Sequence, residues 1–296
     1  MEKTKLKKRL FLFLKLVIAI LAIYLVVGSI DIQKTKAQIL NANFWWLLLA
    51  LIVFNLSKIL GAFRLNYFFK SLGLELDNLY NLKLYYVGML YNQFLPGGIG
   101  GDGYKVYLLN KQYKKSVKKL ITATLLDRLS GGVALGFLML IMAYFGTTKA
   151  VIGSYYWLLI PGVLLAFPIY YILVYYLFPT YKEHRNITSI QAIGVQGLQV
   201  VSAYFILMAL NVDAQFIDYF TLFLVSSIAA LLPISAPGGI GVREYVMAMG
   251  APLLFLDQPS AVALTSLFYL ISLLSAGIGV FFNSKFKTSS EGASDQ

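Results

Sequence analysis

The sequence contains no cysteine and a single histidine, and charged residues make up only 13% of its 296 positions. The lack of cysteine excludes disulfides and thiolate chemistry. The histidine, His184, lies in a polar loop, so the sequence lacks the residues for a histidine metal cluster or a Ser-His-Asp triad. We therefore predict no metal site. A soluble domain would be about one quarter charged, so the low charge content also argues against a soluble fold.

Apolar residues are in excess and form long blocks. The chain is 59% hydrophobic with a mean hydropathy of +0.73, and a transmembrane helix needs roughly 20 apolar residues. The pattern predicts an all-α integral membrane protein with about six transmembrane helices. The expected spans are Leu10–Gly28, Phe44–Phe63, Leu120–Phe145, Tyr156–Phe178, Ile190–Leu210 and Ser260–Phe282.

Lysine and arginine set the expected orientation. The N-terminus, the segments Lys111–Lys119 and Lys182–Arg185 and the C-terminal tail are all basic. The opposite loops carry Asp31, Asp213, Asp218 and Asp257. Because basic loops remain in the cytoplasm, we expect both termini to be cytoplasmic in the bacterial inner membrane. No small-residue cleavage site follows the first span, so we expect it to be retained as an anchor.

The net charge of +12 does not indicate nucleic-acid binding. The cations lie in short loops between membrane spans, and no basic soluble face is present to read a nucleic acid. The cluster Lys114–Lys119 has a spacing suited to anionic lipid headgroups, but a plain topology signal explains it as well. Both interpretations stay open at this point.

The helix-breaking pentapeptide PGGIG occurs twice, at residues 96–100 and 237–241. The offset is 237 − 96 = 141 residues, and Tyr104 and Tyr245 match at the same offset. The flanking spans also superimpose when they are shifted by this amount. We therefore predict two internal repeats, at about residues 44–145 and 185–282, in a membrane domain of residues 1–283 with a short polar tail at 284–296.

The surroundings of the two pentapeptides predict inverted topology. The first broken segment lies between the basic stretches 64–70 and 105–119, whereas Asp213, Asp218 and Asp257 flank the second. Two re-entrant hairpins that enter from opposite sides would satisfy both patterns. Inverted repeats with broken helices are common in transporters, whose substrate site lies at the breaks. A topology in which each broken segment crosses fully is the competing interpretation.

Proline and glycine give the breaks a physical purpose. Proline ends the incoming half-helix, and glycine permits positive φ and close approach of another backbone or a ligand. The outgoing half-helix then begins with free N–H groups and a positive dipole end, which suits a phosphate. Tip-to-tip packing of two hairpins explains the glycines equally well.

Charged residues next to the breaks are the main site candidates, because charges within a membrane are costly. Asp102 and Lys105 follow the first break at i,i+3 spacing and can pair with each other. Arg243 and Glu244 follow the second break and point to different faces, so each needs a partner elsewhere or a ligand. Asp127 and Arg128 are expected to lie nearer the membrane surface and to be partly hydrated. Weaker candidates, whose cations helix-end snorkelling explains, are Lys58, Arg64, Asn66 and Asn92. A purely structural salt-bridge network is the alternative.

The stretch GIGGDG, residues 98–103, matches the G-x-G-x-x-G pattern of dinucleotide-binding folds. That pattern is informative only between a short strand and a helix. Here a long membrane segment precedes it, and the second copy, GIGVRE, lacks the third glycine. We predict no cofactor.

Three motifs together resemble a known family. NQFLPGGIGGDGYKVYLL, LDRLSGG and PISAPGGIGVREY, in this order, resemble the flippase-like membrane family related to the transmembrane region of lysylphosphatidylglycerol synthases. The resemblance extends to about Phe282. It implies movement of a phospholipid, including aminoacylated phosphatidylglycerol, between leaflets. A separate soluble domain attaches the amino acid in those synthases, and the 14-residue tail NSKFKTSSEGASDQ is too short and polar to hold it.

The resemblance also implies the residues of a substrate site. Lys105 stands where many relatives are expected to have arginine. Lysine keeps the positive charge but lacks the guanidinium group that binds a phosphate through two hydrogen bonds. The matching positions are Asn92, Pro96, Gly97, Gly100, Asp102, Lys105, Arg128, Pro237, Gly238, Gly241, Arg243 and Glu244.

These observations predict a protein that translocates a phosphate-bearing lipid. Arg243 or Lys105 would contact the phosphate, and Asp102 or Glu244 would neutralise a cationic headgroup or carry a proton. Expected partners are an anionic or aminoacylated membrane lipid or another lipid-linked substrate, and a lipid-modifying enzyme encoded separately is a candidate. One alternative is a membrane-embedded transferase with Asp102 and Glu244 as acid and base. Another is an ion-coupled small-solute transporter.

Overall fold

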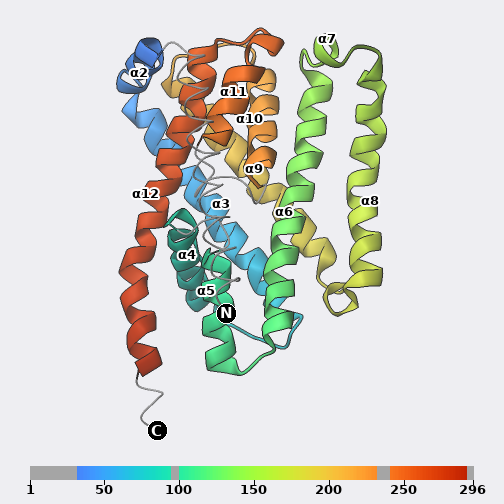
Figure 1. Cartoon of the computed structure of the whole chain (residues 1–296), viewed down its shortest axis with the longest axis vertical. Coiled ribbons are helices and arrows are strands. Elements are labelled where there is room, and N and C mark those ends of the chain that lie inside the picture. Colours follow the sequence, from blue (N-terminus) through green and yellow to red (C-terminus); the bar gives the residue numbers. More distant parts are fainter. Residues whose placement is uncertain (1–31, 95–99, 232–240, 292–296) are drawn as a thin grey trace, which may run out of the picture.

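The structure is a computed structural model that describes residues 32–94, 100–231 and 241–291. Helices are the only regular secondary structure within these ranges (Figure 1). In chain order the α-helices are α2 (Ile32–Leu40), α3 (Phe44–Lys70), α4 (Asn78–Phe94), α5 (Gly100–Tyr113), α6 (Val117–Phe145), α7 (Lys149–Ile152), α8 (Leu159–Leu177), α9 (Arg185–Ala209), α10 (Phe216–Leu231), α11 (Val242–Gly250) and α12 (Gln258–Glu291).

Five helices in the described ranges are long and apolar enough to cross a membrane. They cover five of the six expected spans, apart from the last residue of two of them, and the remaining span, Leu10–Gly28, lies outside the described residues. Many large apolar side chains on their surfaces are exposed, including Leu164 and Tyr176 on α8. A bilayer would cover such a surface, and the expected all-α multi-pass membrane architecture is confirmed.

Helix α3 continues past its expected end. The sequence analysis assigned residues 64–70 to a basic loop, but they form the last two turns of α3. Leu65, Phe68 and Phe69 on these turns are almost fully buried. The helix continues because these apolar side chains and the buried Arg64 have partners in the protein interior, so this loop assignment was wrong.

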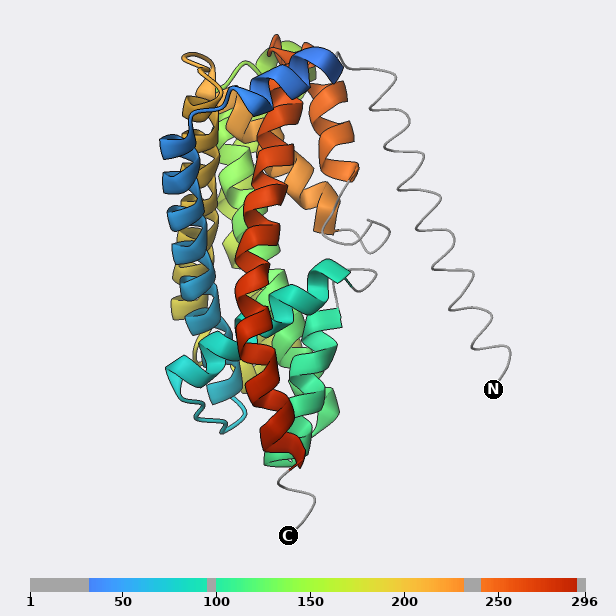
Figure 2. The same cartoon turned by 90° about the vertical axis from the view of Figure 1, so that its left-hand side faces the viewer.

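The two expected hairpins lie at opposite ends of the molecule. Figure 2 shows α4 and α5 in the lower half and α10 and α11 in the upper half, with α12 passing beside both. The outgoing helices begin at Gly100 and, after Gly241, at Val242, as the breaks predict. The other predicted break positions, Pro96, Gly97, Pro237 and Gly238, lie outside the described residues.

The helix contacts of the first half have counterparts in the second half when α2–α6 are exchanged with α8–α12. Helix α3 packs on α9, and the pair α4–α12 has its counterpart in α10–α6. The contacts α4–α5, α5–α6 and α3–α4 likewise match α10–α11, α11–α12 and α9–α10. Even the flanking helices correspond, since α2 packs on α12 as α8 packs on α6. An inverted repeat requires such a pattern, although the exact residue limits of each repeat stay a prediction.

Close backbone approach fixes the first hairpin. A Cβ atom on Gly101 would collide with the backbone of Gly88 on α4, so only glycine allows α5 to lie this close. The sequence analysis expected close approach at the break glycines, and the structure shows it at Gly101, next to Gly100. In the second hairpin Gly241 has φ 81°, a left-handed conformation that glycine adopts without strain.

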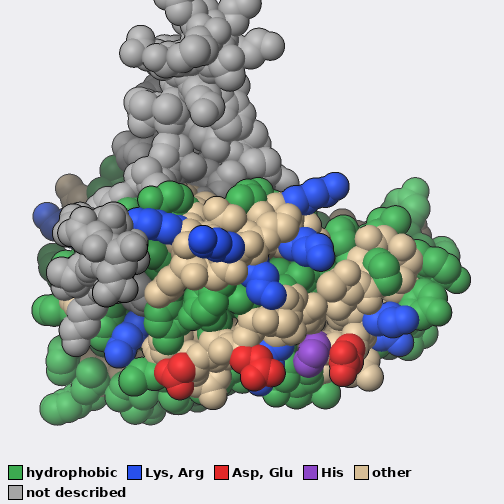
Figure 3. Space-filling view, turned by 90° about the horizontal axis from the view of Figure 1, so that it is seen from below, with side chains coloured by type: hydrophobic (Ala, Val, Ile, Leu, Met, Phe, Trp, Pro, Cys, Tyr) green, Lys and Arg blue, Asp and Glu red, His purple; other side chains and the backbone are tan. Residues whose placement is uncertain are grey.

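Basic side chains gather on the lower end of the molecule, with a row of acidic side chains along one edge (Figure 3). The loops at this end include those between α3 and α4, between α5 and α6 and between α8 and α9, and α12 also ends here (Figures 1 and 2). The basic stretches Lys111–Lys119 and Lys182–Arg185 therefore lie at one end. Which side of the membrane this end faces stays a prediction.

Candidate functional site

A cavity of about 200 Å³ lies where α3, α4, α5, α6, α9 and α10 meet. Four of the described residues that line it are basic and two are acidic, although it lies among membrane helices. The lining consists of Lys58, Arg64, Tyr85, Met89, Asn92, Asp102, Lys105, Asp127, Arg128, Gly131, Gly132, Leu135, Val195, Gln196, Gln199 and Leu231. Charges at this position are costly and are functional candidates by default.

Arg64 and Asp127 form a buried ion pair. Arg64 Nε on α3 donates to Asp127 Oδ1 on α6 at 2.7 Å, and the side chains are 6% and 12% exposed. The guanidinium Nη1 atom is buried and has no hydrogen-bond partner among the described residues. Asp127 was expected to be partly wet, and its burial shows that this expectation was wrong.

Asp102 holds two cations at once. Its Oδ1 accepts from Lys105 Nζ at 3.2 Å, which confirms the expected i,i+3 pair on α5. Its Oδ2 accepts from Arg128 Nε on α6. The Lys105 ammonium also lies 4.7 Å from the centre of the Tyr85 ring, a cation–π contact. Asp102 thereby ties the first hairpin to α6 and closes one side of the cavity.

Lys58 differs from the other three cations. Its ammonium lies 4.3 Å from the centre of the Phe54 ring, and among the described residues no carboxylate forms an ion pair with it. Arg64 and Arg243 are close enough to repel it. The cavity therefore contains a cation with no anionic partner in the described part of the chain.

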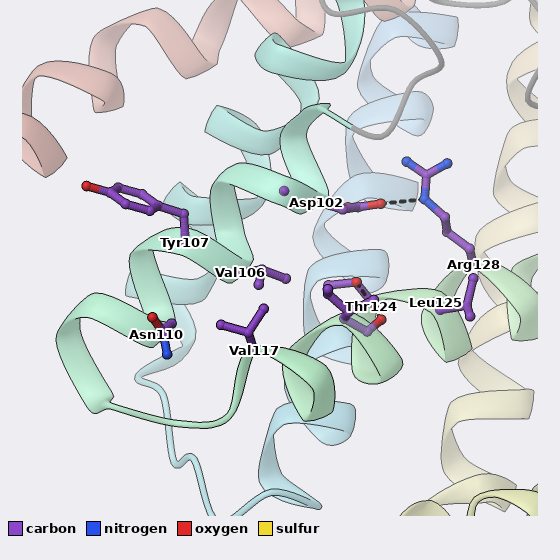
Figure 4. Close-up of a pocket in the computed structure, with 10 residues that line it drawn as sticks. Asp102, Val106, Tyr107, Asn110, Val117, Thr124, Leu125 and Arg128 are labelled. Carbon is purple, nitrogen blue, oxygen red and sulfur yellow. Dashed lines mark hydrogen bonds and ion pairs between the residues drawn. The ribbon is translucent and has the colours of Figure 1, made fainter. Parts of the chain in front are cut away.

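A second, larger hollow adjoins the charged cavity. It has a volume of about 550 Å³ and lies between α5 and α6. Figure 4 shows Asp102 reaching from α5 toward Arg128, beside Val106, Val117 and Thr124. Tyr107, Ile121 and Leu125 are more than half exposed on its rim, so it opens on the apolar surface. We call this hollow the apolar groove; its lining is Asp102, Gly103, Val106, Tyr107, Asn110, Val117, Ile121, Thr124, Leu125 and Arg128.

The amide groups at the starts of the outgoing helices are partly occupied. Asn92 Oδ1 accepts from the Gly101 amide at 2.8 Å, and Glu244 Oε2 accepts from the Gly241 amide at 2.8 Å. Glu244 thus caps its own helix, as N3 glutamates do. The sequence analysis expected Glu244 to neutralise a headgroup or carry a proton, and in the structure its carboxylate instead accepts a hydrogen bond from its own helix start.

Arg243 on α11 contacts two other helices of its own repeat, α10 and α12. Its Nη1 donates to Ser227 Oγ on α10 at 2.8 Å, and its guanidinium carbon lies 5.5 Å from the centre of the Phe268 ring on α12. The predicted need for a partner on another element is therefore met by a hydroxyl and an aromatic face. Arg243 is also close enough to Lys58 for the two positive charges to repel each other.

The structure brings together only some of the predicted site residues. Asn92, Asp102, Lys105 and Arg128 line the charged cavity. Gly100, Gly241, Arg243 and Glu244 are not among the described residues that line it.

Several lining residues were missed or ranked low by the sequence analysis. Lys58 and Arg64 were attributed to snorkelling, and Gln196 and Gln199 were not considered. The sequence did contain a signal for Gln196 and Gln199, because two side-chain amides at i,i+3 on an apolar helix share one face. A polar stripe on an otherwise apolar membrane helix indicates a polar interior.

The fold and the site define a multi-pass α-helical membrane protein with a charged internal cavity. The chain belongs to the family of the lysylphosphatidylglycerol synthase transmembrane region, whose family model matches residues 12–193. It is also similar to two archaeal proteins described as UPF0104 membrane proteins. The one from Pyrococcus horikoshii is 22% identical over 94% of this chain and 99% of its own length. The one from Methanocaldococcus jannaschii is 25% identical over 63% of this chain and 89% of its own length.

Proposed function

We propose that the protein moves a phosphate-bearing lipid between the leaflets of a bacterial cytoplasmic membrane, with its basic end in the cytoplasm. One observation carries the proposal: Asp102 and Arg128 line both the charged cavity and the apolar groove. The two spaces thus share a wall, one with four cations and the other mostly apolar. A lipid has the same two-part character, since a charged headgroup is joined to apolar chains.

The position of the groove supports a lipid over a small solute. Ile121 and Leu125 on its rim are 51% and 56% exposed on the apolar surface of the protein. An acyl chain in the groove could remain in the bilayer while its headgroup enters the charged cavity. A transporter of small solutes needs a cavity sealed from lipid, and this lateral groove argues against that alternative.

The carboxylates do not favour the alternative of a membrane-embedded transferase. Asp102 is held by Lys105 and Arg128, and Glu244 is held by the Gly241 amide. Both therefore have structural partners, whereas a general acid and base must reach the reacting group. The function supported best is lipid movement without chemistry.

Filling the groove tests the proposal. The Ile121→Trp variant places a bulky ring in the groove, and Leu164→Trp adds the same ring on the exposed face of α8, where Leu164 is 68% exposed. Each protein is reconstituted into vesicles with tail-labelled fluorescent phosphatidic acid, and its transfer between leaflets is followed by dithionite quenching. Ile121→Trp should slow transfer at least about tenfold, a barrier increase of roughly 1.4 kcal/mol, and Leu164→Trp should match wild type. Equal rates for Ile121→Trp and wild type would refute the proposal.

A further inference from the structure

The charged cavity has an excess of positive charge. Among the described residues that line it, Lys58, Arg64, Lys105 and Arg128 face only Asp102 and Asp127. The formal balance is 4 − 2 = +2. The adjacent pair Arg243 and Glu244 adds no net charge. Uncompensated charge away from water is costly, so a balance of this sign favours an anionic occupant.

The excess can be assigned to particular atoms. Asp102 is shared by Lys105 and Arg128, and Asp127 accepts from Arg64. Lys58 has an aromatic ring in place of a carboxylate. Arg64 Nη1 is buried without a hydrogen-bond partner among the described residues, and buried donors are normally satisfied. Free donor capacity therefore exists on two cations that line the same cavity.

The neighbourhood of Arg64 is kept open by a glycine. A Cβ atom on Gly131 would lie 3.3 Å from Arg64 Nη1 and 3.7 Å from Gln196 Nε2. The guanidinium and the amide thus converge on a position where the chain has no side chain. Gln196 Nε2 donates to the carbonyl oxygen of Gly131 at 3.3 Å, which leaves its second N–H for another acceptor.

We infer that the charged cavity selects a headgroup with about two negative charges, a phosphomonoester or a diphosphate, over singly charged, zwitterionic or aminoacylated phosphodiester headgroups. Lys58 and Arg64 contact its phosphate oxygens. This inference rests on the proposed lipid function and names the substrate class of the same site. A phosphomonoester carries a charge of about −1.5 to −2 at pH 7, which matches the excess. An aminoacylated headgroup brings an amine, which adds positive charge to a cavity that already has too much.

The selectivity is measured on the purified full-length protein in detergent. The probes are dioctanoyl phosphatidic acid, dioctanoyl phosphatidylglycerol and dioctanoyl phosphatidylethanolamine, which share their chains and differ in headgroup charge. Ligands that bind the folded state raise its apparent stability, so dissociation constants follow from thermal-shift titrations. Phosphatidic acid should bind at least about tenfold more tightly than either of the others. Equal affinities would overturn the inference.

Variants at Lys58 assign the selectivity to this cavity. Lys58→Gln should reduce the preference for phosphatidic acid to less than about threefold, and Lys58→Arg should retain most of it. Lys149→Gln is the matched control, because Lys149 also faces an aromatic ring, Tyr156 at 5.9 Å, but lies at the upper end of the protein on α7. An unchanged preference in a folded Lys58→Gln variant would overturn the inference. Size-exclusion chromatography checks folding.

Two further measurements separate this inference from the proposed function. Ile121→Trp should weaken the binding of all three lipids and leave their ratio unchanged. Inorganic phosphate alone has no chain for the groove and should require at least about 100-fold higher concentration than phosphatidic acid. Equal potency of inorganic phosphate would overturn the assignment of a lipid ligand. Selective binding without transfer between leaflets would refute only the proposed function, and transfer without selectivity would refute only this inference.

Discussion

Arg64 Nε donates to Asp127 Oδ1 at 2.7 Å and thereby joins α3 to α6 in the interior of the protein. Removing one partner of a buried ion pair leaves an uncompensated charge, at a cost of about 3–5 kcal/mol. Asp127→Asn should therefore lower the unfolding temperature in detergent strongly. The double variant Arg64→Met, Asp127→Leu should recover much of the loss, because two apolar groups replace the pair. Additive losses in the double variant would show that the two residues do not interact.

Gly101 and Gly103 provide a matched test of packing in the first hairpin. A Cβ atom on Gly101 would collide with the backbone of Gly88, whereas one on Gly103 would meet nothing within 4 Å. Gly101→Ala should destabilise the protein by at least about 1–3 kcal/mol. Gly103→Ala should be neutral or slightly stabilising, because alanine favours helix by about 1 kcal/mol. Thermal unfolding of both variants checks this, and similar losses in both would contradict the observed contact.

Substitutions of Glu244 should lower the stability of the protein and leave its headgroup selectivity unchanged. Its carboxylate accepts the Gly241 amide and caps α11. Loss of a helix cap costs about 0.5–2 kcal/mol, so Glu244→Ala should lower the unfolding temperature. Glu244→Gln keeps an acceptor and should lose less. Both should keep the wild-type ratio of affinities for phosphatidic acid and phosphatidylethanolamine. A change in that ratio would restore the headgroup role that the sequence suggested.

The lowered pKa of Asp257, in the loop before α12, predicts that the stability of the protein depends on pH. Burial raises its pKa, but hydrogen bonds from the Ser260 hydroxyl and amide and from Gln38 outweigh burial and hold the pKa below its ordinary value. A lowered folded-state pKa stabilises the protein above the unfolded-state pKa, about 3.9, and this contribution is lost as the pH falls through the folded-state pKa. The difference in unfolding temperature between wild type and Asp257→Asn should therefore be larger at pH 7 than at pH 3. A difference that does not vary with pH would contradict this.

Topology can be tested directly, because the sequence has no cysteine. Single cysteines at Glu75 and Ser116 flank the first hairpin, and those at Asp213 and Leu253 flank the second; all four positions are exposed. An impermeant maleimide should label the cysteines at 213 and 253 in intact cells, and those at 75 and 116 only after permeabilisation. Labelling of 213 and 253 from opposite sides would mean that α10 and α11 cross the membrane, and the inverted arrangement would be wrong.

The sequence by itself determined the membrane class, the approximate positions of five spans and the starts of the outgoing half-helices at Gly100 and, after Gly241, at Val242. These features depend on the local composition of the chain, because apolar length and helix-breaking residues act over a few turns. The Asp102–Lys105 pair is local in the same sense, since i,i+3 residues on a helix are neighbours. Each of these properties can be derived from a short window of residues.

Only the tertiary structure decided which charges share a cavity. Arg64 and Asp127 are 63 residues apart, and nothing in either local sequence indicates the other. The continuation of α3 through residues 64–70 likewise depends on tertiary contacts, because Leu65, Phe68 and Phe69 are buried there and Arg64 pairs with Asp127. Lys58 and Gln196 likewise meet the cavity through the packing of α3, α6 and α9. The excess of cations is a sum over charged residues on three helices, α3, α5 and α6, and the chain order alone does not contain that sum.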